Sequence, residues 1–319
     1  MTLLALVEAQ AARLDQAGVC FGHGTTNAFD EAAWLVLWRL GLPLDALDEQ
    51  VDAPVTPEQQ AAVEALVDER IRTRRPAAYL TGEAWLQGVP FFVDERVIVP
   101  RSLIAEPLAD GTLDAWLPAE TRRAFARKTR KGPRPARGRA RARPRVRGSV
   151  LDLCTGNGSL AVLAALAWPE VGVDATDVSA DALAVARRNV ERHHLQDRIR
   201  LRLGDGLAAA DGAYDLILCN PPYVNRDSMN QLPPEYRAEP ALALDGNVEG
   251  GRDGMDFVRR LLAGAARHMT PQGVLVLEIG HERDHFEAAF PRLETVWLPT
   301  SAGDDQVLLL TRSALAQRP

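Results

Sequence analysis

The stretch Val150-Leu151-Asp152-Leu153-Cys154-Thr155-Gly156-Asn157-Gly158 decides the fold, because a short apolar run ends there in a turn that contains two glycines. The run has strand character up to Leu153, and a helical pattern follows from Gly158. Glycines in such a turn let the backbone approach a ligand closely, and the first turn of the helix offers free N–H groups. The stretch therefore predicts a strand, a turn and a helix that together face a ligand.

The alternation of strand and helix continues to the C-terminus. Strands are predicted at 150–153, 171–177, 199–203, 214–219, 274–279 and 305–311, and helices from Gly158, from Ser179 and after 279. This order is typical of an α/β fold with a mainly parallel sheet and helices on both faces. In such folds, ligands bind at the carboxyl ends of the strands.

The first part of the chain predicts helices instead. Apolar residues recur at helical spacing from the start, and a second apolar helix stops at Gly41. Thr56 and Gln59 have the spacing of a capping box, and the helix that they start ends before Pro76. We expect a small all-helical domain at 1–76.

A connector is expected at 77–100, between this domain and a larger one at 101–319. The runs VPFFV and RVIVP on either side of Asp94-Glu95 predict a short hairpin. A helix is expected to follow from Ser102 to about Leu117.

The composition is that of a globular protein. The 319 residues are 46% hydrophobic and 25% charged, and this length favours two domains. Neither a signal peptide nor a membrane span can be recognised, so a cytoplasmic protein is expected. Cys20, Cys154 and Cys219 are odd in number and lack CxxC spacing, which fits neither a disulfide framework nor a zinc site, and no metal is expected.

The net charge of -6 hides one strongly basic segment. Between Thr121 and Arg147 there are thirteen Lys or Arg residues and no Asp or Glu. The segment is rich in Pro, Gly and Arg and has too little apolar surface to offset its ordering entropy, so a mobile basic insertion is expected at about 120–148. Segment 122–147 either contacts RNA phosphates without sequence preference or is a solvated insertion with no role.

The glycine turn alone admits more than one ligand. The stretch Gly156-Asn157-Gly158-Ser159-Leu160-Ala161 satisfies the GxGxxG/A fingerprint of dinucleotide sites, and Asp177 lies at about the distance along the chain at which an acidic residue holds the ribose. The region fits a dinucleotide and S-adenosylmethionine equally well. A purely structural turn is a third interpretation.

The motif Asn220-Pro221-Pro222-Tyr223 favours S-adenosylmethionine. It directly follows the predicted strand 214–219 and therefore lies at the ligand edge of the sheet. The two prolines restrict the backbone and lack N–H donors, which leaves carbonyl oxygens and the Asn220 side chain as acceptors for an NH₂ group. An ordinary Asn-Pro turn is the alternative.

A DxxxGxG turn followed by NPPY resembles the amino-methyltransferases, which modify exocyclic amines of DNA bases or glutamine amides of proteins. The stretches RPAAYLTGEAWLQGVPFFVDERVIVPRS, LDLCTGNGSLAV, NPPYVN and PPEYRAEPALAL together are similar to the protein N5-glutamine methyltransferases. The resemblance covers nearly the whole chain except the basic segment. The branch that acts on peptide release factors usually reads like IPRPDTE where this chain has VPRSLIAE at 99–106. The resemblance is therefore nearest to the branch that acts on ribosomal protein three of the large subunit.

This resemblance implies a Rossmann-like class I methyltransferase domain, with a mainly parallel sheet that includes an antiparallel strand, preceded by a helical substrate-recognition domain. The implied cofactor is S-adenosyl-L-methionine, and the implied partner is large-subunit ribosomal protein three. The cofactor residues implied are Asp152, Gly156 and Gly158 beside its methionine part, Asp177 at the ribose hydroxyls, Asp205 beside the adenine, and Asn220. At the substrate amide, Asn220 and the Pro221 carbonyl would accept its two N–H groups, and Tyr223 would pack near it.

Several alternatives remain open at this point. His281-Glu282-Arg283-Asp284-His285 matches the HExxH pattern of zinc proteases, but it comes directly after a predicted strand and has no obvious third ligand downstream. Other functions are a release-factor glutamine methyltransferase, a DNA adenine N6-methyltransferase, which would need a base-reading domain, and a non-catalytic RNA-binding ribosome-assembly factor. The sequence does not tell which glutamine is modified, whether the substrate is free protein or an assembling subunit, or the oligomeric state.

Overall fold

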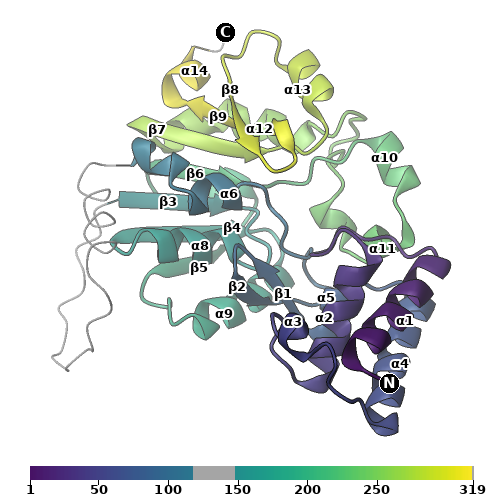
Figure 1. Cartoon of the computed structure of the whole chain (residues 1–319). Coiled ribbons are helices and arrows are strands. Elements are labelled where there is room, and N and C mark those ends of the chain that lie inside the picture. The colour runs from purple at the N-terminus through teal and green to yellow at the C-terminus, as the bar shows by residue number, and fades with distance from the viewer. Residues whose placement is uncertain (118–147, 318–319) are drawn as a thin grey trace, which may run out of the picture. The chain divides into compact units, whose positions relative to one another are not determined.

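A computed structural model of the chain describes residues 1–117 and 148–317 (Figure 1). The chain forms two compact units, and each contains more than one stretch of sequence. The first consists of Met1–Trp85, Pro90–Arg101 and Gln231–Pro240, and the second of Leu86–Val89, Ser102–Asn230 and Ala241–Pro319. The basic insertion expected at about 120–148 lies, up to residue 147, outside the described residues.

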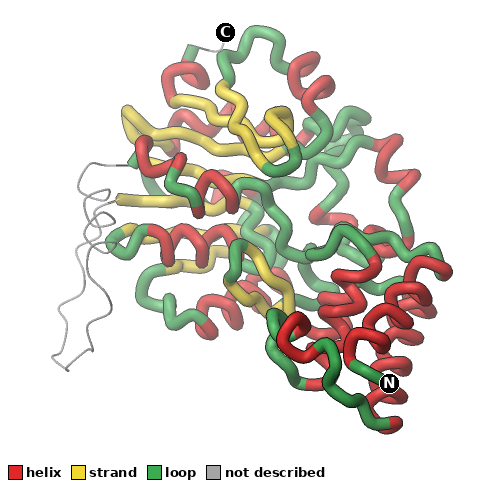
Figure 2. Tube along the Cα trace, in the orientation of Figure 1, coloured by secondary structure: helices red, strands yellow, loops and turns green. Residues whose placement is uncertain are grey.

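Helices build the first unit (Figure 2). They are α1 (Leu3–Gln16), α2 (Ala28–Leu40), α3 (Leu47–Gln50), α4 (Pro57–Thr73), α5 (Ala77–Thr81) and, from the later segment, α11 (Pro234–Arg237). Thr56 and Gln59 form both hydrogen bonds of the predicted capping box, and Gly41 ends α2 with a left-handed φ of 69°. Apolar side chains of α1, α2 and α4 form one buried core, as the helical periodicity predicted.

Buried charges in the first unit are paired. The Arg70 side chain is fully buried, and its Nε lies 2.9 Å from Glu31 Oε1. On its other side, Arg70 Nη1 lies 3.5 Å from Oε1 of Glu235, which the later segment 231–240 contributes. Burial raises the pKa of Glu31, and the Arg70 charge opposes that rise.

A second buried pair joins the same late segment to the first unit. Arg101 donates two hydrogen bonds, of 2.6 and 2.7 Å, to the Glu239 carboxylate, and the Val99 N–H donates a third of 2.8 Å. Burial alone would raise the pKa of Glu239, but the Arg101 charge and His23 outweigh burial and lower it to about 2. Segment 231–240 is therefore tied to the helices by two carboxylates that each face a guanidinium.

The hairpin lies earlier in the chain than the sequence predicted. Its strands are β1 (Glu83–Leu86) and β2 (Val89–Phe92), which form a two-stranded sheet of their own. Gln87 and Gly88 make the turn with φ of 49° and 72°. The prediction of a hairpin around Asp94-Glu95 is wrong, because a two-residue turn with positive φ at both positions favours glycine and matches the strand twist.

A seven-stranded sheet forms the centre of the second unit. Its order is β5-β4-β3-β6-β7-β9-β8. The strands are β3 (Gly148–Leu153), β4 (Val171–Asp177), β5 (Ile199–Leu203), β6 (Tyr214–Cys219), β7 (Met269–Glu278), β8 (Val296–Thr300) and β9 (Gly303–Thr311). The pairs from β5 to β7 are parallel, and β9 runs antiparallel to both of its neighbours. The predicted fold class, with a mainly parallel sheet and an antiparallel strand, is confirmed.

The sequence analysis missed one strand of this sheet and merged two helices. Strand β8 contains Pro299 and only one buried residue, Leu298, which is tolerated because β8 lies at the edge of the sheet. The single helix expected from Ser102 to about Leu117 is wrong: α6 (Ala105–Ala109) and the 3₁₀ helix η1 (Thr112–Trp116) replace it. Gly111, with a φ of 85°, separates the two.

Helices α8 (Ser159–Ala167) and α9 (Ala180–Arg192) contact the strands β3, β4 and β5. Strands β3, β6, β7 and β9 share a buried apolar core with α12 (Asp256–Gly264), α13 (Arg283–Ala289) and α14 (Arg312–Ala316) (Figure 1). The remaining short elements are η2 (Gly206–Ala209), α10 (Arg226–Gln231), η3 (Ala241–Ala243) and η4 (Ala265–His268). The layers hold the strand ends in fixed positions, which is what a site at the sheet edge requires.

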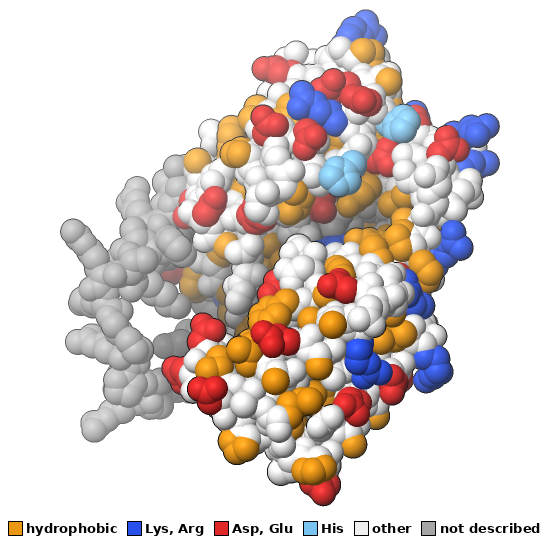
Figure 3. All heavy atoms as spheres, turned by 45° about the vertical axis from the view of Figure 1, so that its right-hand side comes forward, with side chains coloured by type: hydrophobic (Ala, Val, Ile, Leu, Met, Phe, Trp, Pro, Cys, Tyr) orange, Lys and Arg blue, Asp and Glu red, His pale blue; other side chains and the backbone are white. Residues whose placement is uncertain are grey.

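Nothing in residues 1–117 and 148–317 forms a helix both long and apolar enough to cross a membrane. The face of the molecule in Figure 3 shows hydrophobic side chains interspersed with acidic and basic ones.

Candidate active site

The glycine turn is built as the sequence predicted, between β3 and α8. Cys154, Gly156 and Gly158 all have positive φ, of 57°, 56° and 81°. A Cβ added at Gly156 would meet no heavy atom of the described residues within 4 Å, whereas one at Gly158 would lie 3.2 Å from the Cβ of Ala186 on α9. The first glycine therefore leaves an open side from which a ligand can approach, and the second lets two helices pack closely.

Asp152, near the end of β3, stabilises this turn through hydrogen bonds. Its Oδ2 accepts hydrogen bonds from the Thr155 hydroxyl at 2.5 Å and from the Ala161 N–H at 3.0 Å. Its Oδ1 is buried and has no hydrogen-bond partner among the described residues. Burial, with a smaller contribution from the Asp177 charge, raises the pKa of Asp152 to about 7. A buried acceptor that lacks a partner is expected where a ligand or water completes the site.

Asp177 ends β4 next to the same turn. One carboxylate oxygen accepts from the Gly156 N–H at 2.9 Å, and the other accepts from the Ser179 N–H at 2.9 Å. Burial raises the pKa of Asp177, and these backbone donors oppose the rise. The structure therefore brings Asp177 together with the glycine turn, and each carboxylate oxygen keeps a further lone pair for a ligand hydroxyl.

The NPPY loop leaves the sheet beside this turn. Cys219 at the end of β6 is in register with Leu153 at the end of β3, and the two strands are parallel neighbours. Asn220 and Cys154 therefore begin adjacent loops at one edge of the sheet. Asn220 is partly exposed and Pro221 is buried. This edge carries a glycine turn and an acceptor-rich loop side by side, which is the arrangement a methyl donor and an amine acceptor require.

Asp205 lies further along the same edge, after β5. Its exposed carboxylate accepts a 2.6 Å hydrogen bond from Arg260 on α12, and Arg260 Nε also lies 2.8 Å from Glu249 Oε1. A hollow of about 360 Å³ borders Asp205 and the ring of Phe257. The sequence analysis did not include Arg260, because an ion pair between residues 205 and 260 has no local signature.

The HExxH stretch has a different geometry from a metal site. His281 lies in the turn before α13 and His285 lies within the helix, so one helical face does not carry both. The Glu282 carboxylate instead contacts His285 Nδ1 and accepts two hydrogen bonds from Asn225, just after the NPPY motif. Among the described residues, no group of three or more His, Cys, Asp or Glu is arranged to hold a metal ion.

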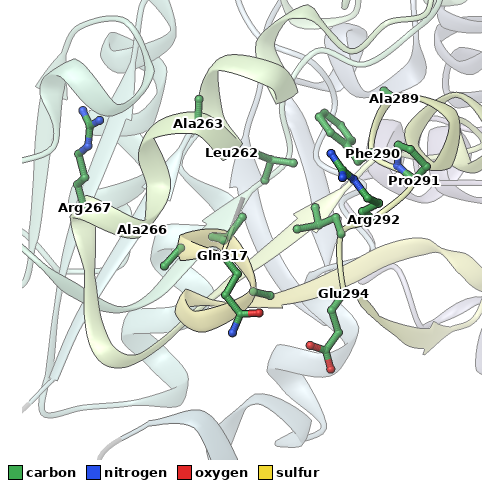
Figure 4. A pocket seen from close by; sticks show the side chains of 14 residues that line it. Leu262, Ala263, Ala266, Arg267, Ala289, Phe290, Pro291, Arg292, Glu294 and Gln317 are labelled. Atoms are coloured by element: carbon green, nitrogen blue, oxygen red, sulfur yellow. The ribbon is translucent and has the colours of Figure 1, made fainter. Parts of the chain in front are cut away.

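A larger hollow of about 930 Å³ lies elsewhere in the second unit (Figure 4). Leu262, Phe290, Glu294 and Gln317 are among the side chains that line it, and none of the predicted site residues does. Volume alone would point there, but the unpaired carboxylate oxygen and the glycine turn lie at the sheet edge. The sheet edge is therefore the candidate active site.

Known proteins are similar to this chain along nearly its whole length. The family model of the Methyltransferase small domain matches residues 141–232, which include both the glycine turn and the NPPY motif. A ribosomal protein uL3 glutamine methyltransferase of Bordetella pertussis is 53% identical over 98% of this chain and 96% of its own length. Relatives of the same name from Burkholderia pseudomallei and Neisseria meningitidis serogroup B are 49% and 44% identical, each over 98% of this chain and over 95% and 94% of their own lengths.

The fold and the site define an S-adenosylmethionine-dependent methyltransferase of the Rossmann-like class I. Within that class, the chain belongs to the family of the ribosomal protein uL3 glutamine methyltransferases.

Proposed function

We propose that this chain transfers a methyl group from S-adenosylmethionine to the side-chain amide nitrogen of a glutamine in ribosomal protein uL3. The observation that carries the proposal is the position of the NPPY loop, directly beside the glycine turn at the carboxyl ends of β3 and β6. The names of the relatives support the substrate, and the resemblance of the motifs supports the nitrogen that is modified. The cytoplasm, where ribosomes are assembled, is the expected location.

An amide nitrogen is a poor nucleophile because its lone pair is shared with the carbonyl. We propose that Asn220 Oδ1 and the Pro221 carbonyl accept the two amide N–H groups, hold the nitrogen in line with the methyl group, and stabilise the positive charge that develops on nitrogen. Positioning of this kind contributes at best about 7–11 kcal/mol to lowering a barrier, and fixed dipoles that face a developing charge are often the largest electrostatic contribution. Tyr223 packs beside the amide.

The same proposal assigns residues to each part of S-adenosylmethionine. When S-adenosylmethionine is bound, it supplies the electrophilic methyl group. Asp152, Gly156 and Gly158 line its methionine part, Asp177 accepts from the ribose hydroxyls, and Asp205 lies beside the adenine, with Asn220 at the methyl group. The unpaired Asp152 Oδ1 and the open side of Gly156 fit a ligand at this turn. The nitrogen becomes acidic as it is methylated and releases one of its two protons, so the products are N5-methylglutamine, S-adenosylhomocysteine and a proton.

The helical unit at the N-terminus is proposed to recognise the protein substrate. Trp38, Leu44 and Trp85 line a groove of about 650 Å³, and Asp45 and Glu83 add carboxylates to it. Arg39 is the one Lys or Arg between residues 14 and 69, where the chain has eleven Asp or Glu. A ribosomal protein neutralises RNA phosphates with Lys and Arg and is therefore basic. An acidic groove with aromatic side chains can bind such a basic protein.

Labelled cofactor tests the whole proposal. The purified chain is incubated with S-adenosylmethionine that carries an isotopically labelled methyl group and with purified uL3, and tandem mass spectrometry locates the label. We expect one methyl group on a glutamine side chain of uL3. No label on uL3, together with label on a release factor or on DNA adenine in parallel incubations, would reject the substrate.

Two variants test the recognition surface. Trp85→Ala is expected to raise KM for uL3 and to leave S-adenosylmethionine affinity unchanged, because the groove is lined only by residues of the first unit. Phe29→Ala is the matched control, since Phe29 is an exposed aromatic residue of the same unit that does not line the groove. Equal effects of the two variants would remove the groove from substrate recognition.

Contact with ribosomal RNA through segment 122–147 is a separate proposal, and the segment lies outside the described residues. Thirteen Lys or Arg without an acidic residue support it. Deleting the segment should leave methylation of free uL3 nearly intact and slow methylation of ribosomal particles at low salt. A deletion that abolishes cofactor binding would reject this proposal.

A further inference from the structure

The proposed reaction does not use Glu282, although the residue is nine-tenths buried and charged. Its exposed fraction is 6%, and it precedes α13 in the turn that follows β7. Its side chain makes no capping hydrogen bond to α13. A buried carboxylate needs partners, so its contacts indicate what it does.

The Glu282 carboxylate binds Asn225, the last residue of the NPPYVN stretch. Its Oε1 accepts one hydrogen bond of 3.2 Å from the Asn225 backbone N–H and another of 2.7 Å from Asn225 Nδ2. The Asn225 Oδ1 accepts from the Ser228 N–H at 2.9 Å and so caps the start of α10. Asn225 is thus held through its backbone and both side-chain polar atoms.

The turn between β7 and α13 also contacts the NPPY loop at Tyr223. Gly280 has a φ of 53°, and a Cβ there would lie 2.6 Å from Cε2 of the Tyr223 ring. Gly254 lies on another side, where a Cβ would come within 2.0 Å of the Tyr223 carbonyl oxygen. These approaches are possible only with glycine, so the backbone of the β7–α13 turn packs directly against Tyr223.

We propose that Glu282 is a positioning residue for methyl transfer, and that it fixes the NPPY loop through Asn225. The inference rests on the proposed function, because it assigns Asn220 and Pro221 to the substrate amide. The loop is anchored at its start by β6 and at Val224 by backbone hydrogen bonds with Leu244 and Gly246. Glu282 adds a side-chain anchor at the next residue, Asn225, so its loss would let the segment that carries the acceptors shift. Displacement of a reacting group by about 1 Å can cost about 10²-fold in rate.

Glu282→Ala is the principal test, with kcat, KM for uL3 and the dissociation constant of S-adenosylmethionine measured separately. We expect kcat to fall by about 10²-fold while the other two constants stay at wild-type values. Glu282→Gln should restore most of the rate, because its amide oxygen can still accept from Asn225. Glu287→Ala, on the exposed side of the same helix, is the matched control and should behave as wild type.

Hydrogen exchange gives a readout that does not depend on activity. Without cofactor, the amides of residues 220 and 223–226 should exchange faster in Glu282→Ala than in wild type or Glu287→Ala. If wild type fails to methylate uL3, the proposed function is wrong, and the exchange result still decides whether Glu282 holds the loop. Unchanged exchange would overturn the inference, and so would an unchanged kcat or a weaker affinity for S-adenosylmethionine.

Asn225→Ala keeps the inference testable if Glu282→Ala does not fold. It removes the Asn225 Nδ2 hydrogen bond to Glu282 and leaves the backbone N–H bond, so it should lower kcat to a smaller extent than Glu282→Ala. The double variant should lose no more than Glu282→Ala, because the residues act through one contact. Additive losses would show that they act independently and would overturn the inference.

Discussion

Two buried carboxylates, one in each unit, are held in opposite ways. In the helical unit, Glu239 is bonded by Arg101 and its pKa is lowered to about 2. In the sheet unit, Asp152 faces no cation in its hydrogen bonds, one of its oxygens has no partner among the described residues, and burial raises its pKa to about 7. The difference teaches that a buried carboxylate held by a guanidinium belongs to the fold, whereas one without a cationic partner marks the place where a ligand binds.

The largest effect is expected from breaking a paired charge in the helical unit. Arg70→Ala leaves Glu31 and part of Glu235 buried without their partner, and losing one member of a buried pair costs about 3–5 kcal/mol. Urea-induced unfolding measures the loss. Arg252→Ala is the control, because its pair with Asp227 is largely exposed and such pairs contribute about 0–1 kcal/mol. Similar losses in the two variants would contradict the distinction.

A smaller effect, on binding rather than folding, is expected at the glycine turn. Asp177→Ala removes a charged acceptor for ribose hydroxyls, and such a hydrogen bond contributes about 1.5–3 kcal/mol. Titration calorimetry with S-adenosylmethionine should show weaker binding by the corresponding factor. Because Asp177 also accepts from the Gly156 N–H, Asp177→Asn is measured beside it to keep one acceptor at the turn. An unchanged dissociation constant in folded Asp177→Ala would remove this residue from the site.

A third expected effect is a pH dependence of stability caused by Asp152. Its pKa is about 7 in the folded protein against 3.8 in the unfolded chain, so between those values the native state binds more protons. Stability from this group is therefore complete below about pH 4 and falls as the pH rises through 7. Urea unfolding of wild type and Asp152→Asn at pH 5 and pH 8 isolates the effect. Between pH 5 and pH 8, we expect the free energy of unfolding to fall more in wild type than in the variant. Equal losses in the two proteins would contradict the raised pKa of Asp152.

Much of the second unit could be predicted from sequence, because most of its strands are rich in apolar residues and bounded by turn residues. Strand β8 was not predicted, because Pro299 and the exposed positions of this short strand break that pattern. The hairpin was misplaced because strand character extends beyond β2, and only the positive φ of Gln87 and Gly88 identifies the turn. Local patterns predict elements well and their boundaries less well.

In the candidate site too, features that are local in sequence could be predicted and contacts between distant residues could not. The glycine turn and the NPPY motif are each contiguous in sequence, so their chemistry could be read directly. The contacts of Glu282 with Asn225 and of Arg260 with Asp205 join residues that are 57 and 55 positions apart. No spacing rule links such pairs, and Glu282 was visible only as part of an HExxH match that pointed to the wrong chemistry.

The central claim is that the NPPY loop holds the amide that is methylated. It is tested most directly by the single-turnover rate of methyl transfer to uL3 in Asn220→Ala, measured beside cofactor affinity. We expect the rate to fall by about 10²–10³, as when one preorganised polar contact to a developing charge is lost, while S-adenosylmethionine affinity barely changes. A wild-type rate in the folded variant would mean that the loop is structural, and it would contradict the account.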